Sequence, residues 1–206
     1  EGIEALGVDL DDGMLEACRA LQLPALKGDA VVHLAGLPSE SLAVISAFHM
    51  VEHIPFEVLQ RLVSEAHRVL VPGGLLIMET PNPENIAVAT RDFYLDPTHQ
   101  RPIPPQLLGY LPEYFGFHRS KTLRLQQSAR LEQDPRPSLM DVIAGASPDY
   151  AVVAQKAASP SQLAAFDAAF GVEYGLSLQR LTDRYDAAHA TKVQQADAIA
   201  QQAKAM

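Results

Sequence analysis

The chain has 206 residues, 48% of them hydrophobic, which is enough for one α/β domain and an additional segment. Its formal net charge of −9 argues against general binding to nucleic-acid backbones or anionic membranes, because those surfaces attract basic proteins. The single cysteine, Cys18, excludes an internal disulfide framework and favours a reducing, cytoplasmic compartment. No apolar run approaches the roughly 20 residues that span a bilayer.

The first part of the chain predicts two short strands separated by a helix. Residues 3–9 form a strand ending in Asp9, and residues 12–21 form a helix capped by Asp11 or Asp12. Residues 23–29 form the second strand, which ends at an acidic residue too. In nucleotide-binding folds, an acid at a strand end accepts hydrogen bonds from ribose hydroxyls. A simple turn or capping role remains open for Asp9.

Residues 43–81 predict a strand, a helix and a second strand. An apolar run at 43–48 is followed by apolar residues at helical spacing over 55–70. Pro72, Gly73 and Gly74 should end that helix before the second strand begins at residue 75. We expect the two strands to be parallel and covered on both faces. The polar turn after residue 48 would then lie at the carboxyl edge of the sheet, where ligands bind.

The rest of the chain predicts a loop, two strands and a helical tail. Residues 82–106 are rich in proline and polar residues, and should form a loop over the strand ends. A short helix near residue 107 precedes strands at 119–125 and 150–154. From Ser159 onward, helical spacing predicts an extension that could form a coiled coil, dock on another chain, or be a frayed tail.

The sequence FHMVEHI, followed by RVLVPGGLLIMETPNPEN, resembles the fourth and fifth strands of class I S-adenosylmethionine-dependent methyltransferases, with the helix between them. The resemblance runs from about residue 3 to residue 156. It implies an α/β, Rossmann-like, mostly parallel sheet with an antiparallel final hairpin over residues 1–156, and leaves 157–206 as the helical extension. It also implies that S-adenosylmethionine is the cofactor. The cofactor-binding residues that it implies are Asp9, Leu10, Gly28, Asp29, Ala30, Phe48 and His49.

One part of that family's pattern is missing. The family holds the methionine end of its cofactor on a glycine-rich loop after the first strand, and none of the twelve glycines here forms a G-x-G sequence. The resemblance begins at the family's second strand. We therefore expect a fragment whose sheet lacks its first strand, with a gap between strands 3–9 and 43–48. Unless another segment fills the gap, the chain should bind cofactor poorly.

His49, Glu52 and His53 form an H-x-x-E-H sequence, with His99 downstream, and three interpretations remain open. These residues could only make local hydrogen bonds. All four could hold a divalent ion, as in O-methyltransferases with E-x-x-E-H, although histidine replaces the first glutamate here. The sequence is also a zinc peptidase signature, which would require a long helix. We assign no metal ligand from sequence. Without metal, His53 or His99 is the predicted general base, since imidazole exchanges protons near neutral pH.

The predicted reaction is O-methylation of a small or saccharide-like acceptor. The sequence DPTHQRPIPPQLL resembles methyltransferase domains of bacterial surface-polysaccharide clusters. We expect neither a nucleic-acid partner nor a membrane span, and homo-oligomerisation through the C-terminal helix could occur. The competing hypothesis is a non-catalytic scaffold that presents this helix to a partner.

Overall fold

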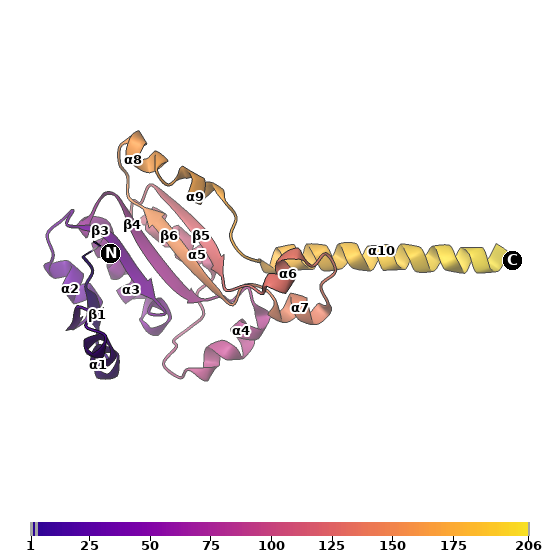
Figure 1. Ribbon diagram of the computed structural model, residues 1–206, viewed down its shortest axis with the longest axis horizontal. Helices are drawn as coiled ribbons and strands as arrows, with labels where there is room; N and C mark the ends of the chain where they lie inside the picture. The colour runs from indigo at the N-terminus through magenta and orange to yellow at the C-terminus, as the bar shows by residue number, and fades with distance from the viewer. Residues whose placement is uncertain (1, 3, 206) are drawn as a thin grey trace.

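The computed structural model describes residues 2 and 4–205; the predicted strand residue at position 3 lies outside this part of the chain (Figure 1). The strands are β1 (Gly7–Asp9), β2 (Ala25–Lys27), β3 (Leu42–Phe48), β4 (Leu70–Pro81), β5 (Arg119–Leu125) and β6 (Asp149–Gln155). The helices are α1 (Asp12–Ala20), α2 (Ala30–Gly36), η1 (Val51–His53), α3 (Phe56–Val69), α4 (Ile86–Thr90), η2 (Asp92–Leu95), α5 (Pro105–Tyr114), α6 (Ala129–Gln133), α7 (Leu139–Ala144), α8 (Pro160–Ala164), α9 (Asp167–Gly171) and α10 (Leu178–Ala205), where η1 and η2 are 3₁₀ helices.

The strands form two separate sheets. β1 pairs in parallel with β2, and the larger sheet has the order β3-β4-β6-β5. In the larger sheet β3 and β4 are parallel, whereas β6 runs antiparallel to both of its neighbours. In the described part of the chain no strand lies between β1 and β3, so the predicted gap in the sheet is observed.

Capping aspartates start the two helices of the N-terminal part. The side chain of Asp11 accepts a hydrogen bond from the Met14 amide at 2.8 Å, which makes Asp11, and not Asp12, the N-cap of α1. Asp29 caps α2 in the same way, through the Val32 amide at 2.9 Å. Helix α2 was not predicted, because its seven residues are too few to show a clear helical period.

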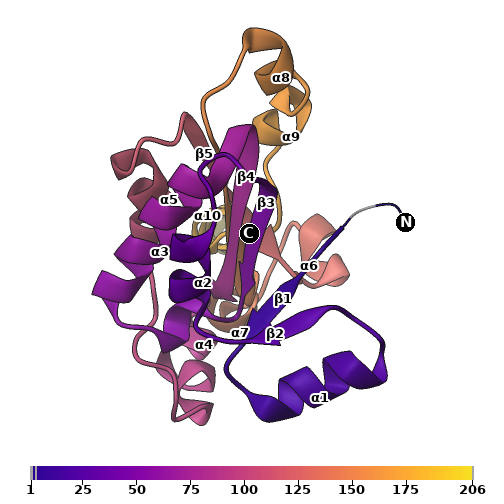
Figure 2. The same cartoon turned by 90° about the vertical axis from the view of Figure 1, so that its left-hand side faces the viewer.

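The hydrophobic core lies on one face of the larger sheet. α3 buries Leu59, Leu62, Val63, Ala66 and Val69 against β4 and β6, and Figure 2 shows α3 and α5 on the same side of this sheet. Each fully buried leucine or valine stabilises the fold by about 1.5–3 kcal/mol relative to an exposed one. This packing explains why the amphipathic pattern predicted α3 correctly.

The other face of β3 is open, so the prediction of two covered faces is wrong for this strand. Val44 and Phe48 on β3 are 53% and 58% exposed. The segment α8–α9 approaches only the neighbouring strands, where Phe166 and Phe170 lie near Leu75, Leu123 and Val153. β3 is therefore both an edge strand and a half-exposed one, because no described element covers its second face.

β4 begins at Leu70 and not at residue 75. Gly73 has φ +80°, and the register of β3 against β4 shifts between Leu42 and Val44. A Cβ atom on Gly74 would lie 2.9 Å from the Ala43 carbonyl oxygen, so the neighbouring strand approaches too closely for a side chain there. The Pro-Gly-Gly sequence therefore makes an irregular strand start and not a loop.

The predicted loop at 82–106 contains α4 and η2, and the connection before β6 contains α6 and α7. α6 and α7 pack with the first turns of α10 in a second apolar cluster of Leu131, Val142, Ala146, Leu176 and Leu181. Beyond this cluster α10 projects away from the body of the molecule (Figure 1). None of the helices in residues 2 and 4–205 is long and apolar enough to cross a membrane.

Candidate functional site

His49 follows β3 directly and has φ +47°, a left-handed conformation that costs a non-glycine residue about 1–2 kcal/mol. Its amide donates to the Glu79 carbonyl oxygen at 3.0 Å and so holds the turn against β4. The imidazole lies between two carboxylates: Nδ1 is 3.3 Å from Glu52 Oε1, and Nε2 is 3.5 Å from Glu79 Oε1. The turn therefore directs one histidine into an acidic environment.

Glu52 lies on η1 and is 1% exposed. Thr80 at the end of β4 donates its hydroxyl hydrogen to Glu52 Oε2 at 3.0 Å. Among the described residues Glu52 Oε1 has no hydrogen-bond partner, although it faces His49 Nδ1. Leaving a buried carboxylate oxygen unpaired is unfavourable by several kcal/mol, so this atom favours a nearby proton or cation.

His53 is oriented by a chain of hydrogen bonds that fixes its tautomer. Thr98 Oγ1 donates to Asp96 Oδ1 at 2.6 Å and lies 2.9 Å from His53 Nδ1. Since the threonine hydrogen points to Asp96, His53 Nδ1 must donate, which leaves Nε2 with a free lone pair. The hydrogen bond from Thr98 holds the pKa of the Asp96 carboxyl below its usual range, so Asp96 stays an acceptor.

His99 has the same arrangement with a different partner. Its Nδ1 lies 2.6 Å from the Phe93 carbonyl oxygen, which can only accept, so Nε2 is again the atom with a free lone pair. The ring centroids of His53 and His99 are 4.6 Å apart. Two imidazoles that can each accept a proton therefore lie side by side, next to buried Glu52.

The structure divides the four candidate metal ligands between two groups. Ligand atoms of Glu52, His53 and His99 lie within 4.8 Å of one another, whereas His49 belongs to a second such group with Glu79 and Asp149. The interpretation left open, that all four residues hold one ion, does not fit His49, because η1 begins only at Val51 and His49 turns toward β4. The absence of a long helix at this motif also removes the basis for the peptidase interpretation.

Glu79 and Asp149 were not among the predicted site residues. Glu79 pairs with Phe48, and Asp149 is the first residue of β6, where it pairs with Pro81. Burial raises the pKa of the Asp149 carboxyl; Glu79 and Glu52 add to the shift and His49 opposes it. The position of Glu79 at a strand end was visible in the sequence, but the antiparallel register that brings Asp149 beside it was not.

The residues expected to contact the adenosyl group occupy the ends of β1, β2 and β3. Gly28 donates its amide hydrogen to the Asp9 carbonyl oxygen at 2.9 Å, which places the first two strand ends together. Asp9 Oδ1 accepts from the Asp11 amide at 2.8 Å, and the second oxygen has no partner in the described part of the chain. Leu10 and Phe48 are exposed, and Ala30 begins α2. The cofactor roles of these residues remain predictions.

These strand ends share one edge of the molecule. In Figures 1 and 2, β1 and β3 run in the same direction, so Asp9 and His49 follow strands that end on the same side. The residues present fit the adenosine half of a cofactor site, because Asp9 keeps a free carboxylate oxygen there. In residues 2 and 4–205 no glycine-rich loop follows a strand to hold the methionine half.

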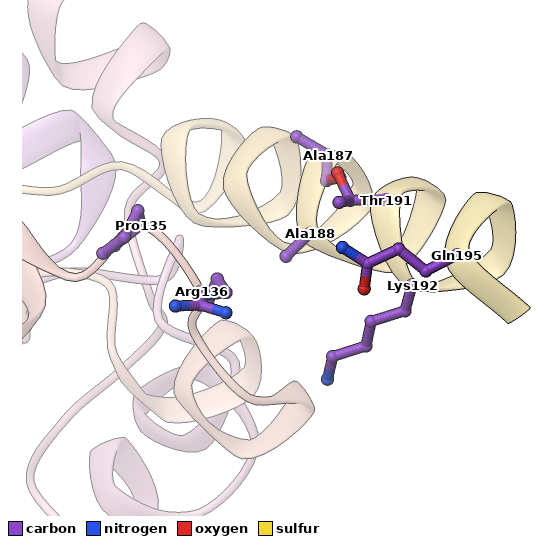
Figure 3. Close-up of a pocket in the computed structure, with 7 residues that line it drawn as sticks. All are labelled: Pro135, Arg136, Ala187, Ala188, Thr191, Lys192 and Gln195. Carbon is purple, nitrogen blue, oxygen red and sulfur yellow. The ribbon is translucent and has the colours of Figure 1, made fainter.

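A hollow of about 350 Å³ lies elsewhere, between the loop at Pro135 and Arg136 and helix α10 (Figure 3). Its helical wall is formed by Ala187, Ala188, Thr191, Lys192 and Gln195. It contains no carboxylate or imidazole and none of the predicted site residues. The residues predicted to act on cofactor or acceptor therefore lie outside this hollow.

Residues 1–78 match a family model described as "Methyltransferase domain". A protein of Mycolicibacterium smegmatis named as a probable S-adenosylmethionine-dependent methyltransferase is 35% identical over 97 residues. That match covers 47% of this chain and 37% of the relative, so the chain spans well under half of the relative's length.

Solved structures extend the similarity to most of the chain. A methyltransferase from Archaeoglobus fulgidus described as SAM-dependent has 28% identity and a TM-score of 0.68, over 76% of this chain and 77% of that one. A structure from Thermotoga maritima described as a possible histamine N-methyltransferase has a TM-score of 0.54 at 18% identity, over 73% and 72%, and supports the fold alone. The matching N-terminal residues and the similar solved structures support a Rossmann-like, S-adenosylmethionine-dependent methyltransferase domain as what this chain is similar to.

Proposed function

We propose that this chain takes part in S-adenosylmethionine-dependent methylation of a hydroxyl oxygen on a small or saccharide-like acceptor. The observation that carries the proposal is the pair of imidazoles, His53 and His99, each with a free Nε2, at the carboxyl edge of a methyltransferase sheet. The saccharide class rests on the sequence resemblance of residues 96–108 alone. We further propose a cytoplasmic location, consistent with the free Cys18.

The cofactor supplies a methyl group already bonded to positively charged sulfur, so the protein's part is orientation and proton removal. Asp9, Leu10, Gly28, Asp29, Ala30, Phe48 and His49 are the residues proposed to hold the adenosyl group. The acceptor hydroxyl would lose its proton to His53 Nε2 as its oxygen accepts the methyl. Ionised Asp96, acting through Thr98, would stabilise the imidazolium that forms, as the carboxylate does in a Ser-His-Asp triad.

His99 would assist as a second base or as a hydrogen bond acceptor for the acceptor's neighbouring hydroxyl. Its ring lies 4.4 Å from the ring of Phe93, measured between centroids, and its Nδ1 bonds a neutral carbonyl. An imidazole whose Nδ1 is linked by hydrogen bonds to a carboxylate is a better proton acceptor than one whose Nδ1 donates to a neutral carbonyl oxygen. We therefore assign the main base role to His53.

We also propose that the chain by itself binds cofactor weakly. The described residues include those proposed for the adenosine side but no glycine-rich loop for the methionine side, and the separated sheets leave β1 and β3 without a strand between them. Calorimetric titration with S-adenosylmethionine should show a dissociation constant above the micromolar range. Micromolar binding would contradict this part of the proposal.

The test of the main proposal is transfer of a radiolabelled methyl group from S-adenosylmethionine to methyl glycosides of common hexoses. His53→Ala should lower turnover by about 10²–10⁴-fold, the usual contribution of a general base. The matched control is His118→Ala, an exposed histidine before β5. Equal turnover in His53→Ala, His118→Ala and the unmodified chain would remove the base assignment.

The projecting part of α10 favours one second candidate, a scaffold that presents this helix to another copy of the chain. Val193 and Ile199 on α10 are exposed large hydrophobic residues. Analytical ultracentrifugation should then show a dimer for the whole chain and a monomer after truncation at residue 186. A monomer for both would exclude self-association through α10.

A further inference from the structure

We propose that His49, Glu79 and Asp149 form a divalent cation site, with Glu52 as the residue that orients His49. This site is separate from the His53 base, and its role, positioning of the acceptor oxygen, rests on the proposed function. The binding of the ion itself does not. The donor atoms of these three residues lie within 4.8 Å of one another, close enough to surround a single ion.

The geometry follows from the register of three strands. Phe48 pairs with Glu79 across β3 and β4, so the turn at His49 comes directly beside Glu79. Glu79 pairs with Ala151, and Pro81 pairs with Asp149, across β4 and β6. Directly paired residues and residues two apart along a strand share a face, so Glu79 and Asp149 are diagonal neighbours on one face. Three separate segments thus bring their donors to one point.

The charge balance of this point favours a cation. Three carboxylates, on Glu52, Glu79 and Asp149, gather around the single imidazole of His49, so acidic side chains outnumber basic ones at this point. Like charges at this separation repel one another unless a proton or metal ion compensates them. A bound divalent cation would compensate two of the three charges.

Glu52 provides the second, independent observation. Its side chain is fully buried and its Oε2 already accepts from Thr80. Its Oε1 has no hydrogen-bond partner within residues 2 and 4–205 but faces His49 Nδ1 at 3.3 Å. If His49 Nε2 binds a metal ion, Nδ1 must carry the hydrogen and donate it to Glu52 Oε1. This is the carboxylate–histidine–metal arrangement common in metalloproteins, and it accounts for the unpaired buried oxygen.

The donor set also narrows the class of ion. One imidazole nitrogen and two carboxylates suit Zn²⁺ or Mn²⁺ better than Ca²⁺ or Cu⁺. His49 is partly exposed, so solvent and an acceptor can reach the site. The fourth coordination position would be left for an acceptor hydroxyl, whose pKa the ion would lower.

The alternative ion-binding group consists of Glu52, His53 and His99. The two groups differ in which substitutions should abolish ion binding. Mn²⁺ titration followed by electron paramagnetic resonance, without cofactor, should show one ion bound per chain. Asp149→Asn and Glu79→Gln should each abolish this binding, whereas His99→Ala should retain it. Glu52→Gln should weaken affinity about 10–100-fold, because it changes only the orienting residue.

The control is Glu57→Gln, which removes an exposed carboxylate at the start of α3 and should leave Mn²⁺ affinity unchanged. Circular dichroism and thermal unfolding of each variant separate lost binding from lost folding. Absence of saturable Mn²⁺ and Zn²⁺ binding would overturn the inference, as would loss of binding in His99→Ala with retention in Asp149→Asn. Because metal binding is measured without methyl transfer, its failure leaves the His53 proposal intact.

Discussion

The two faces of β3 show how differently this sheet is supported. Toward α3, the strand and its neighbour β4 join a core in which Leu62, Met78 and Val152 are almost fully buried. On the opposite face Val44 and Phe48 lie exposed, and β3 has only β4 as a partner in the described chain. The comparison indicates that the helix-covered face maintains the fold, whereas the exposed face of β3 contributes little stability.

The largest expected effect comes from a cavity in the covered face. Leu62→Ala should lower the free energy of unfolding by about 2–5 kcal/mol, because the surrounding core cannot fully collapse into the space. Val44→Ala on the exposed face should change it by less than about 0.5 kcal/mol. Urea denaturation of both variants measures the difference. Similar losses for the two would mean that the outer face of β3 is covered in solution.

The first turns of α10 are packed in an apolar cluster and its later turns are exposed, and this difference gives a second, smaller contrast in stability. Leu181 is buried in the cluster with Leu131 and Val142, so Leu181→Ala should cost about 2–3 kcal/mol. Truncation after residue 186 removes an exposed length of helix and should leave the thermal midpoint of the monomer nearly unchanged. A large fall in the midpoint on truncation would show that the tip of α10 packs against something in solution.

A third expected effect concerns the buried carboxylate at the site. Glu52→Gln keeps an oxygen acceptor for Thr80 but removes a buried charge with an unpaired oxygen, so stability without metal should rise by about 1 kcal/mol. Thermal unfolding in a chelator measures this gain. A loss of stability instead would indicate that Glu52 Oε1 already has a partner, such as His49 Nδ1.

The smallest expected effect is the pH dependence of the free energy of unfolding that comes from Asp141 on α7. Hydrogen bonds from Arg130, and next from Ser138, lower the pKa of Asp141 to about 2. A folded-state pKa below the unfolded value of ~4 means that Asp141 stabilises the fold at neutral pH and loses this contribution as pH falls from ~4 toward ~2.

The Asp141→Asn variant tests this contribution. Because Arg130 is mostly exposed, we expect the variant to be about 0.5 kcal/mol less stable than the unmodified chain at pH 7 and equally stable near pH 2. Urea midpoints at the two pH values give the comparison. A difference that persists at low pH would mean that the aspartate acts through packing and not through its charge.

Local patterns in the sequence predicted much of the fold. α3 and the last two strands follow from apolar spacing, which is a property of neighbouring residues. The predictions that were wrong concern features set by contacts between residues far apart in the chain. α3 ends before Pro72 as predicted, but the strand predicted from residue 75 begins at Leu70, and the close approach of Ala43 makes Gly74 part of it. The gap between β1 and β3 was foreseen, because the missing glycine-rich segment is itself a sequence feature.

The candidate site was predicted only in part, for the same reason. His53 and His99 were named from their residue type and position, and they lie with their rings together. Asp149 could not be found, since it meets His49 only through the register of β6 on β4. The left-handed turn that places His49 with Glu79 and Asp149, and not with His53 and His99, is also a tertiary property, fixed by its hydrogen bond to β4.

The most direct test of the account is a ¹H–¹⁵N NMR titration of the chain with S-adenosylhomocysteine, which remains informative when binding is weak. The account predicts that the amides of Asp9 and Leu10, Gly28 to Ala30, and Phe48 and His49 shift together with one dissociation constant. Amides around Pro135 and on α10 should not shift. Shifts confined to the hollow beside α10, or none at millimolar ligand, would contradict the claim that these three strand ends form one adenosyl-binding edge.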